Sequence, residues 1–177
     1  MTSVVTSQQK ATELLRTQYQ VSHGWLEATL GEVTAAQLSY QPPGNATSVA
    51  AQYAHIVTSE DFFVNAILRG GVPVMATANT GLSEMPPPDT NWGAWARRVQ
   101  VDLAAARAYS QTVYAATGEY LSSIVDDDLG RPLDLTNVGL GPQTVGSLLT
   151  TLLINANNHC GEISAVKGLQ GLKGYPV

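Results

Sequence analysis

Four long segments of the sequence carry apolar residues at every third or fourth position. They run approximately over residues 7–30, 48–68, 91–117 and 143–167. This spacing is typical of an amphipathic helix, because about 3.6 residues per turn place such residues on one face. The sequence therefore predicts an all-α fold, in which four helices bury their apolar faces against one another as a four-helix bundle.

The connection between the second and third predicted helices is unusually long. It covers about residues 70–90, and its prolines, Pro73 and Pro86–Pro88, prevent a helix from continuing through it. A tight antiparallel turn needs far fewer residues, whereas a segment of this length lets the chain cross the bundle before the next helix begins. We therefore expect an up-down-down-up bundle with a long crossover between helices two and three.

The composition fits one compact domain and excludes several classes of protein. Of the 177 residues, 44% are hydrophobic and 13% are charged, so residues 1–177 are expected to share one core as a single domain. The net charge of −5 and the scattered basic residues make nucleic acid and anionic membrane surfaces poor partners. No apolar run in the sequence reaches the ~20 residues that span a bilayer.

The cysteine content and the N-terminus favour a reducing compartment. Cys160 is the single cysteine and cannot form an internal disulfide. Residues 1–6 lack the positively charged and apolar regions of a secretory signal. We therefore expect a cytoplasmic protein.

Polar residues interrupt the apolar faces of the fourth and second predicted helices. On the fourth, Asn155, His159 and Glu162 follow at spacings of four and three, so they line one inward edge. On the second, His55 is expected to be partly buried, and Glu60 lies in the apolar stripe, where a carboxylate needs a partner. Either histidine can be a metal ligand or a hydrogen-bonded core residue. Glu60 can cross-link helices through a tryptophan or backbone donor, or it can assist catalysis.

The remaining histidine and a neighbouring carboxylate are assigned to the surface. His23 falls on the outer edge of the first predicted helix, where we expect it in solvent, and Asp61 falls on the outward edge of the second. The first helix is expected to face the core through an apolar stripe. Its centre is Leu14, Val21, Trp25 and Ala28, and Leu15, Leu26 and Leu30 widen it.

The crossover also decides whether His55 and His159 lie at the same height. With a rise of about 1.5 Å per residue, His55 lies ~12 Å from the end of the bundle where the second helix begins. His159 lies ~13 Å from that same end if the third helix runs in the direction of the second. In a simple up-and-down bundle, His159 would instead lie near the opposite end. A joint site therefore depends on the crossover.

Several short motifs, in this order, resemble the DinB/YfiT-like superfamily over nearly the whole chain. They are Trp25, the turn Leu38-Ser39-Tyr40-Gln41-Pro42-Pro43, Ala54-His55-Ile56 with Ser59-Glu60-Asp61-Phe62, and Asn155-Ala156-Asn157-Asn158-His159-Cys160-Gly161-Glu162-Ile163. The resemblance implies a divalent metal ion, of the zinc or nickel class, held by one histidine on the second helix and two on the fourth. By position these ligands are His55, Asn155 and His159, so Asn155 stands where the superfamily has a histidine.

The resemblance also implies an activity. Characterised members include thiol-dependent transferases and isomerases in which the metal is thought to activate a thiol or water, so we expect a metal-dependent enzyme of the transferase or hydrolase type. Its substrate would be a small molecule or a thiol. Because catalytic zinc usually has three good protein ligands, Asn155 keeps a second possibility open. The second possibility is a metal-free protein that binds a small molecule or a partner. We further expect a homodimer formed through an exposed helical face.

Overall fold

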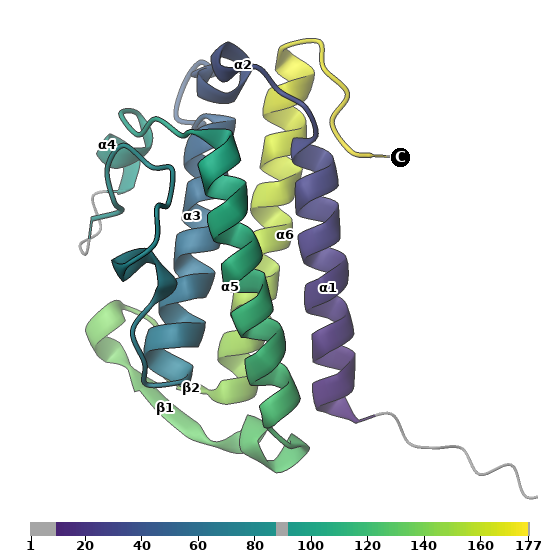
Figure 1. Cartoon of the computed structure of the whole chain (residues 1–177), viewed down its shortest axis with the longest axis vertical. Helices are drawn as coiled ribbons and strands as arrows, with labels where there is room; N and C mark the ends of the chain where they lie inside the picture. Colours follow the sequence, from purple (N-terminus) through teal and green to yellow (C-terminus); the bar gives the residue numbers. More distant parts are fainter. Residues whose placement is uncertain (1–9, 88–91, 177) are drawn as a thin grey trace, which may run out of the picture.

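Long helices dominate the structure, a computed structural model that describes residues 10–87 and 92–176. The long elements are α1 (Ala11–Leu30), α3 (Val49–Asp61) with its π-helical continuation η1 (Phe62–Leu68), α5 (Leu103–Ser123) and α6 (Val145–Leu169). They lie side by side, with α1 and α3 each packed against both α5 and α6 (Figure 1). The predicted helical character of the chain is therefore confirmed.

Short elements connect the long helices. The helical ones are α2 (Ala35–Ser39), η2 (Val74–Ala76), α4 (Trp92–Ala96), η3 (Asp126–Gly130) and η4 (Thr136–Val138). Two strands, β1 (Pro132–Leu135) and β2 (Gly141–Thr144), form an antiparallel hairpin just before α6. This hairpin was not predicted, because four-residue strands with few apolar residues leave little periodicity in the sequence.

The predicted third helix, residues 91–117, is wrong as a single element. Residue 91 lies outside the described residues, and the remainder is divided into α4 and α5 by a non-helical stretch. The Asp102 carboxylate accepts hydrogen bonds from the N–H groups of Ala104 and Ala105, which starts a new helix. The Asp102 N–H donates to the carbonyl of Gly81 in the crossover. A Cβ atom at Gly81 would lie 2.6 Å from the Asp102 carbonyl oxygen, so this close approach requires glycine.

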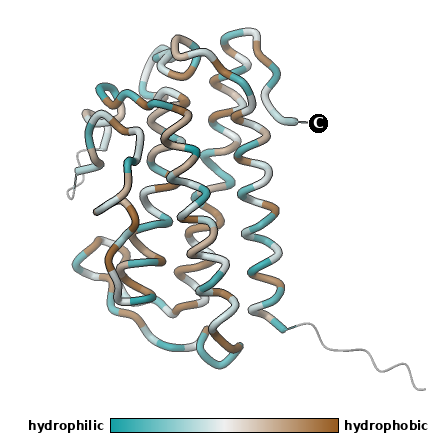
Figure 2. The backbone as a smooth tube through the Cα atoms, viewed as in Figure 1, coloured by the Kyte–Doolittle hydropathy of each residue, from teal (hydrophilic) through white to brown (hydrophobic). Residues whose placement is uncertain are grey.

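Helix α1 buries one edge of the predicted stripe and exposes its centre. Leu26 and Leu30 lie in the core as expected, together with Tyr19, whereas the centre of the stripe, Leu14, Val21, Trp25 and Ala28, is exposed. Figure 2 shows hydrophobic and hydrophilic segments alternating along each long helix. The prediction failed because α1 carries two apolar stripes with the same spacing, and the periodicity does not show which of them packs inward.

Asp61 anchors the crossover to α3 and is fully buried, so its predicted outward position is wrong. Its carboxylate accepts hydrogen bonds from the N–H groups of Val74 at 2.8 Å and Met75 at 2.7 Å. The Tyr109 hydroxyl on α5 and the Asn65 amide also donate to it, each at 2.8 Å. The crossover covers a face of α3 that would otherwise meet water. The Asp61 carboxylate satisfies two backbone N–H donors of the crossover.

No helix in the described ranges combines the length and the apolar character that crossing a bilayer would require.

Candidate functional site

The three residues that the superfamily resemblance assigns as metal ligands meet between α3 and α6. His55 projects from α3, and its Nε2 atom lies 3.3 Å from Oδ1 of Asn155 on α6. The centroids of the His55 and His159 rings are 4.9 Å apart, with the ring planes at 84°. The structure therefore brings His55, Asn155 and His159 together, and their role as metal ligands stays a prediction.

His55 is held in place on three sides. Its Nδ1 atom lies 3.4 Å from the Ser59 hydroxyl, and the Trp92 ring on α4 packs edge-on against it with centroids 4.7 Å apart. With the Asn155 carbonyl oxygen as acceptor, Nε2 carries the proton and Nδ1 accepts from Ser59. Burial, followed by the neighbouring His159, lowers the pKa of His55 to about 4. The imidazole is therefore neutral at pH 7, as a metal ligand must be.

His159 is oriented by a carboxylate from its own helix. Its Nδ1 atom lies 2.7 Å from Oε2 of Glu162, one helical turn further along α6. An N–H donated to this carboxylate leaves the lone pair of His159 on Nε2, and such a partner fixes the orientation of a ligating histidine. We therefore assign Glu162 to the positioning of His159 rather than to the ligand set.

The donor set fits a weakly held ion of the zinc or nickel class. Across residues 10–87 and 92–176, no three His, Cys, Asp or Glu side chains come together as a group that could hold a metal. His55 and His159 supply two imidazoles, which suit these ions, and Asn155 supplies only a neutral oxygen. Calcium and magnesium fit less well, because these ions favour carboxylate and other oxygen ligands.

A second polar cluster occupies the space between α1, α3 and α5. Oε2 of Glu60 lies 2.9 Å from Nε2 of His23, and Oε1 accepts a hydrogen bond from the Thr117 hydroxyl at 2.6 Å. The His23 ring stacks on Tyr114 with centroids 3.7 Å apart. Glu60 is buried and links helices as expected, but its partners are His23 and Thr117 rather than a tryptophan or a backbone group.

The expectation of a solvated His23 is wrong, because only 11% of its side chain is exposed. The buried Glu60 carboxylate needs a donor, and the α1 face that actually packs inward presents His23 to it. This pairing could not be predicted from the helical repeat, because the two residues lie 37 positions apart along the chain. Glu60 engages Nε2 of His23, so this histidine does not complete the ligand set of His55 and His159.

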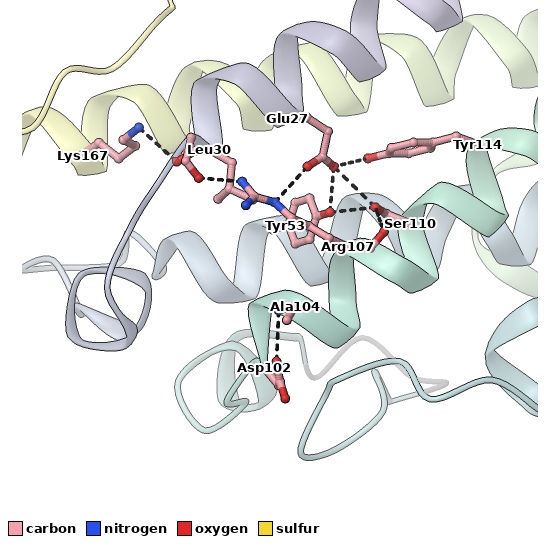
Figure 3. A network of polar contacts seen from close by, with 10 residues as sticks. Glu27, Leu30, Tyr53, Asp102, Ala104, Arg107, Ser110, Tyr114 and Lys167 are labelled. Atoms are coloured by element: carbon pink, nitrogen blue, oxygen red, sulfur yellow. Dashed lines mark hydrogen bonds and ion pairs between the residues drawn. The ribbon is translucent and has the colours of Figure 1, made fainter.

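Glu27 is the centre of a further polar network that the sequence analysis missed (Figure 3). Its carboxylate accepts hydrogen bonds from the hydroxyls of Tyr53 at 2.7 Å and Tyr114 at 3.1 Å, and it pairs with Arg107 at 3.3 Å. Burial raises the pKa of Tyr53 well above its usual value, so this hydroxyl remains a donor at neutral pH. The network fixes α1 and α5 against α3, the helix that carries His55.

Burial of His55 is expected to make the protein sensitive to acid. The unfolded chain takes up a proton at this residue near pH 6.5, whereas the folded chain does so only near pH 4. The free energy of unfolding is therefore at its full value above pH 6.5. It decreases by about 3 kcal/mol as the pH falls to 4, because the unfolded chain takes up the proton first. Urea unfolding of the wild type and of His55→Gln at pH 7.5 and pH 4 measures this, because their stability difference should change by that amount. A constant difference would contradict it.

Together these features define a helical protein with a histidine-containing site between two of its long helices. The sequence model of the DinB superfamily matches residues 18–163, and the chain belongs to that superfamily. The resemblance seen in the sequence motifs is therefore confirmed.

One solved structure is similar over almost the whole chain. It is the crystal structure of a conserved protein from Enterococcus faecalis, with 23% sequence identity and a TM-score of 0.75. The match covers 90% of this chain and 96% of that one. At this identity the likeness shows the fold alone. No curated protein sequence matches the chain.

Proposed function

We propose that the protein binds one divalent ion of the zinc or nickel class through His55 and His159, with Asn155 as a weak third ligand. We further propose that it is a metal-dependent enzyme of the transferase or hydrolase type, acting on a small molecule or a thiol. The observation that carries the proposal is the contact between the two imidazoles, 4.9 Å between centroids, beside the Asn155 amide.

The arrangement of the long helices supports this site. We infer an up-down-down-up order, and the course of the chain in Figure 1 agrees with it, since α3 and α5 both begin at the end where α1 and α6 finish. In this order His55 and His159 lie at the same height of the bundle, as the rise per residue requires. Membership of the DinB superfamily also supports the proposal, because the resemblance to that superfamily is the source of the ligand assignment.

The chain's own residues prepare the site for this chemistry. Burial keeps His55 neutral, Ser59 and Trp92 limit the movement of its ring, and Glu162 sets the orientation of His159. A bound metal ion would lower the pKa of a thiol or water molecule and so supply a nucleophile at neutral pH. Asn155 would either bind this ion weakly or accept a hydrogen bond from the molecule that the ion activates.

Metal analysis of the untagged protein tests the proposal. After incubation with a slight excess of zinc and desalting, the wild type should retain metal, and His55→Ala and His159→Ala should lose it. His23→Gln is the matched control, because that histidine is engaged by Glu60 and its loss should leave the metal content unchanged. With cobalt in place of zinc, an added thiol should produce a sulfur-to-cobalt absorption band. Equal metal content in all four proteins would contradict the proposal.

A second candidate function follows from the hydrogen bond between His55 and Asn155. This bond satisfies Nε2 of His55 without a metal ion, and the same bundle could then bind a small molecule or a partner without catalysis. This function is supported if the wild type holds no metal while Asn155→His binds it stoichiometrically.

A further inference from the structure

A buried lysine lies where the C-terminal ends of α1 and α6 meet. Lys167 on α6 is only 6% exposed, and its Nζ atom donates hydrogen bonds to the carbonyl oxygens of Thr29 and Leu30 at the end of α1 (Figure 3). Lysine is almost never buried to this degree without a partner of opposite charge. Among residues 10–87 and 92–176, however, no carboxylate forms an ion pair with Lys167. Its positive charge is therefore enclosed without a counter-charge.

The two carbonyl contacts explain part of this arrangement. They cap the C-terminal end of α1, where a positive charge is favourable, and Arg107 donates to the Gly31 carbonyl at the same end. An ammonium group has three N–H donors, and these contacts use two of them. In the described part of the chain the third N–H of Lys167 has no acceptor, so a donor as well as a charge remains for a further group.

An open cavity of about 240 Å³ lies beside Lys167. Lys167 is part of its lining, together with Ala28 and Glu32 from the end of α1 and with residues 172–176, which follow α6. Residues 172–176 include a leucine, a tyrosine and a proline, so part of the wall is apolar. The volume is below the roughly 300–1,000 Å³ of pockets that take drug-sized ligands, so the cavity suits a small molecule.

The wall formed by residues 172–176 is closely fitted to both helices. A Cβ atom at Gly174 would lie 3.0 Å from the carbonyl oxygen of Ser164 on α6, so this approach requires a residue without a side chain. The Tyr175 ring packs edge-on against Trp25 on α1, with centroids 5.8 Å apart. These contacts hold the segment against α1 and α6 and give the cavity a defined shape.

Among the described lining residues, the charged groups leave an excess of one positive charge. Lys167 and Lys173 are cationic, and Glu32 is acidic. Lys173 and Glu32 are exposed, so water weakens their fields, whereas the charge of Lys167 acts through less polar surroundings. Burial lowers the pKa of Lys167, and an anion beside it would favour the charged form again. The cavity is therefore suited to a ligand with one negative charge.

We propose that this cavity binds a small organic carboxylate. One carboxylate oxygen accepts the remaining N–H of Lys167, and the apolar part of the molecule lies against Leu172 and Tyr175. The single negative charge is balanced by one buried ammonium group, and the apolar part distinguishes the ligand from inorganic phosphate. His159 lies about two helical turns before Lys167 on α6, or ~12 Å along the helix, so the cavity is separate from the candidate metal site. The proposal does not depend on that site.

Nuclear magnetic resonance titration of the untagged full-length chain with benzoate tests the proposal. Benzoate should shift the amide resonances of Leu172 and Lys173 and bind at one site with a dissociation constant of ~1 mM or lower. Lys167→Met keeps an unbranched side chain and removes the charge, so it should raise this constant at least ~10-fold. Lys10→Met is the matched control, because Lys10 is exposed and precedes α1 at its opposite end, and it should bind benzoate as the wild type does.

Tyr175→Ala tests the site without altering the helices, in case Lys167→Met does not fold, and it should raise the constant ~3-fold or more. Benzyl alcohol has the same ring without the charge and should bind at least ~10-fold more weakly than benzoate. The proposal would be overturned by a wild type that does not bind benzoate, or by affinity that is unchanged in both Lys167→Met and Tyr175→Ala. Equal affinity for benzyl alcohol would also overturn it, since the charge would then be irrelevant. Displacement of benzoate by an equal concentration of inorganic phosphate would do the same, because the site would then be a general anion site.

Discussion

The Asn155→His variant is expected to bind zinc at least ~100-fold more tightly than the wild-type chain. A structural zinc site of four ligands is worth roughly 10–16 kcal/mol, so one good ligand in place of a weak one adds a few kcal/mol. Asn155 already lies against His55 and on the same side of α6 as His159, so an imidazole at this position joins two existing ones. Three imidazoles and an open position form the ligand arrangement of many catalytic zinc sites.

Competition with a coloured zinc chelator measures this gain in affinity. Asn157→His is the matched control, because it adds a histidine to the same helix beside an open groove between α6 and α1. The control should bind zinc no more tightly than the wild type. An equal gain in both variants would mean that any added histidine suffices. The absence of a gain in Asn155→His would show that the three side chains do not share a site.

Replacement of Asp61 by alanine is expected to reduce the free energy of unfolding by about 4 kcal/mol. The substitution removes the acceptor of four hydrogen bonds, two of them from the backbone of Val74 and Met75 in the crossover. Each buried donor left without a partner costs about 1–3 kcal/mol, and part of this cost is recovered when water enters the site. The crossover should therefore detach from α3 more readily.

Urea unfolding at pH 7 measures this loss of stability. Asp134→Ala is the matched control, since Asp134 is an exposed carboxylate that bonds only to Thr136 in the described chain, and it should cost less than about 1 kcal/mol. If Asp61→Ala does not fold, Asp61→Asn keeps the shape and one acceptor oxygen and should show an intermediate loss. Equal stability of Asp61→Ala and Asp134→Ala would be inconsistent with the anchoring role.

The sequence was sufficient to predict the helical class and the residues that meet in the candidate site. His55 and His159 could be placed because the helical repeat gives the position of each along its own helix, and the length of the connection between helices two and three predicts the crossover that brings them to the same height. The motifs around the two histidines led independently to the DinB superfamily, which is confirmed.

The failures concern contacts between distant segments. The buried side of α1 contains Thr12, Ser22 and Thr29, which make it more polar than the exposed stripe of Leu14, Val21 and Trp25. Hydropathy alone therefore favours the wrong face. His23 was misassigned for the same reason, and the Asp61 prediction failed because the covering segment comes from the crossover, whose path the helical repeat does not fix.

Nuclear magnetic resonance of the histidine side chains tests the central claim most directly. The chain has only three histidines, so their ring nitrogens can be followed individually during a zinc titration of the untagged protein. We predict that one equivalent of zinc shifts ring-nitrogen resonances of His55 and His159 together, while His23 stays unchanged in its pair with Glu60. A shift of His23, or of only one ring of the other two, would contradict a shared site.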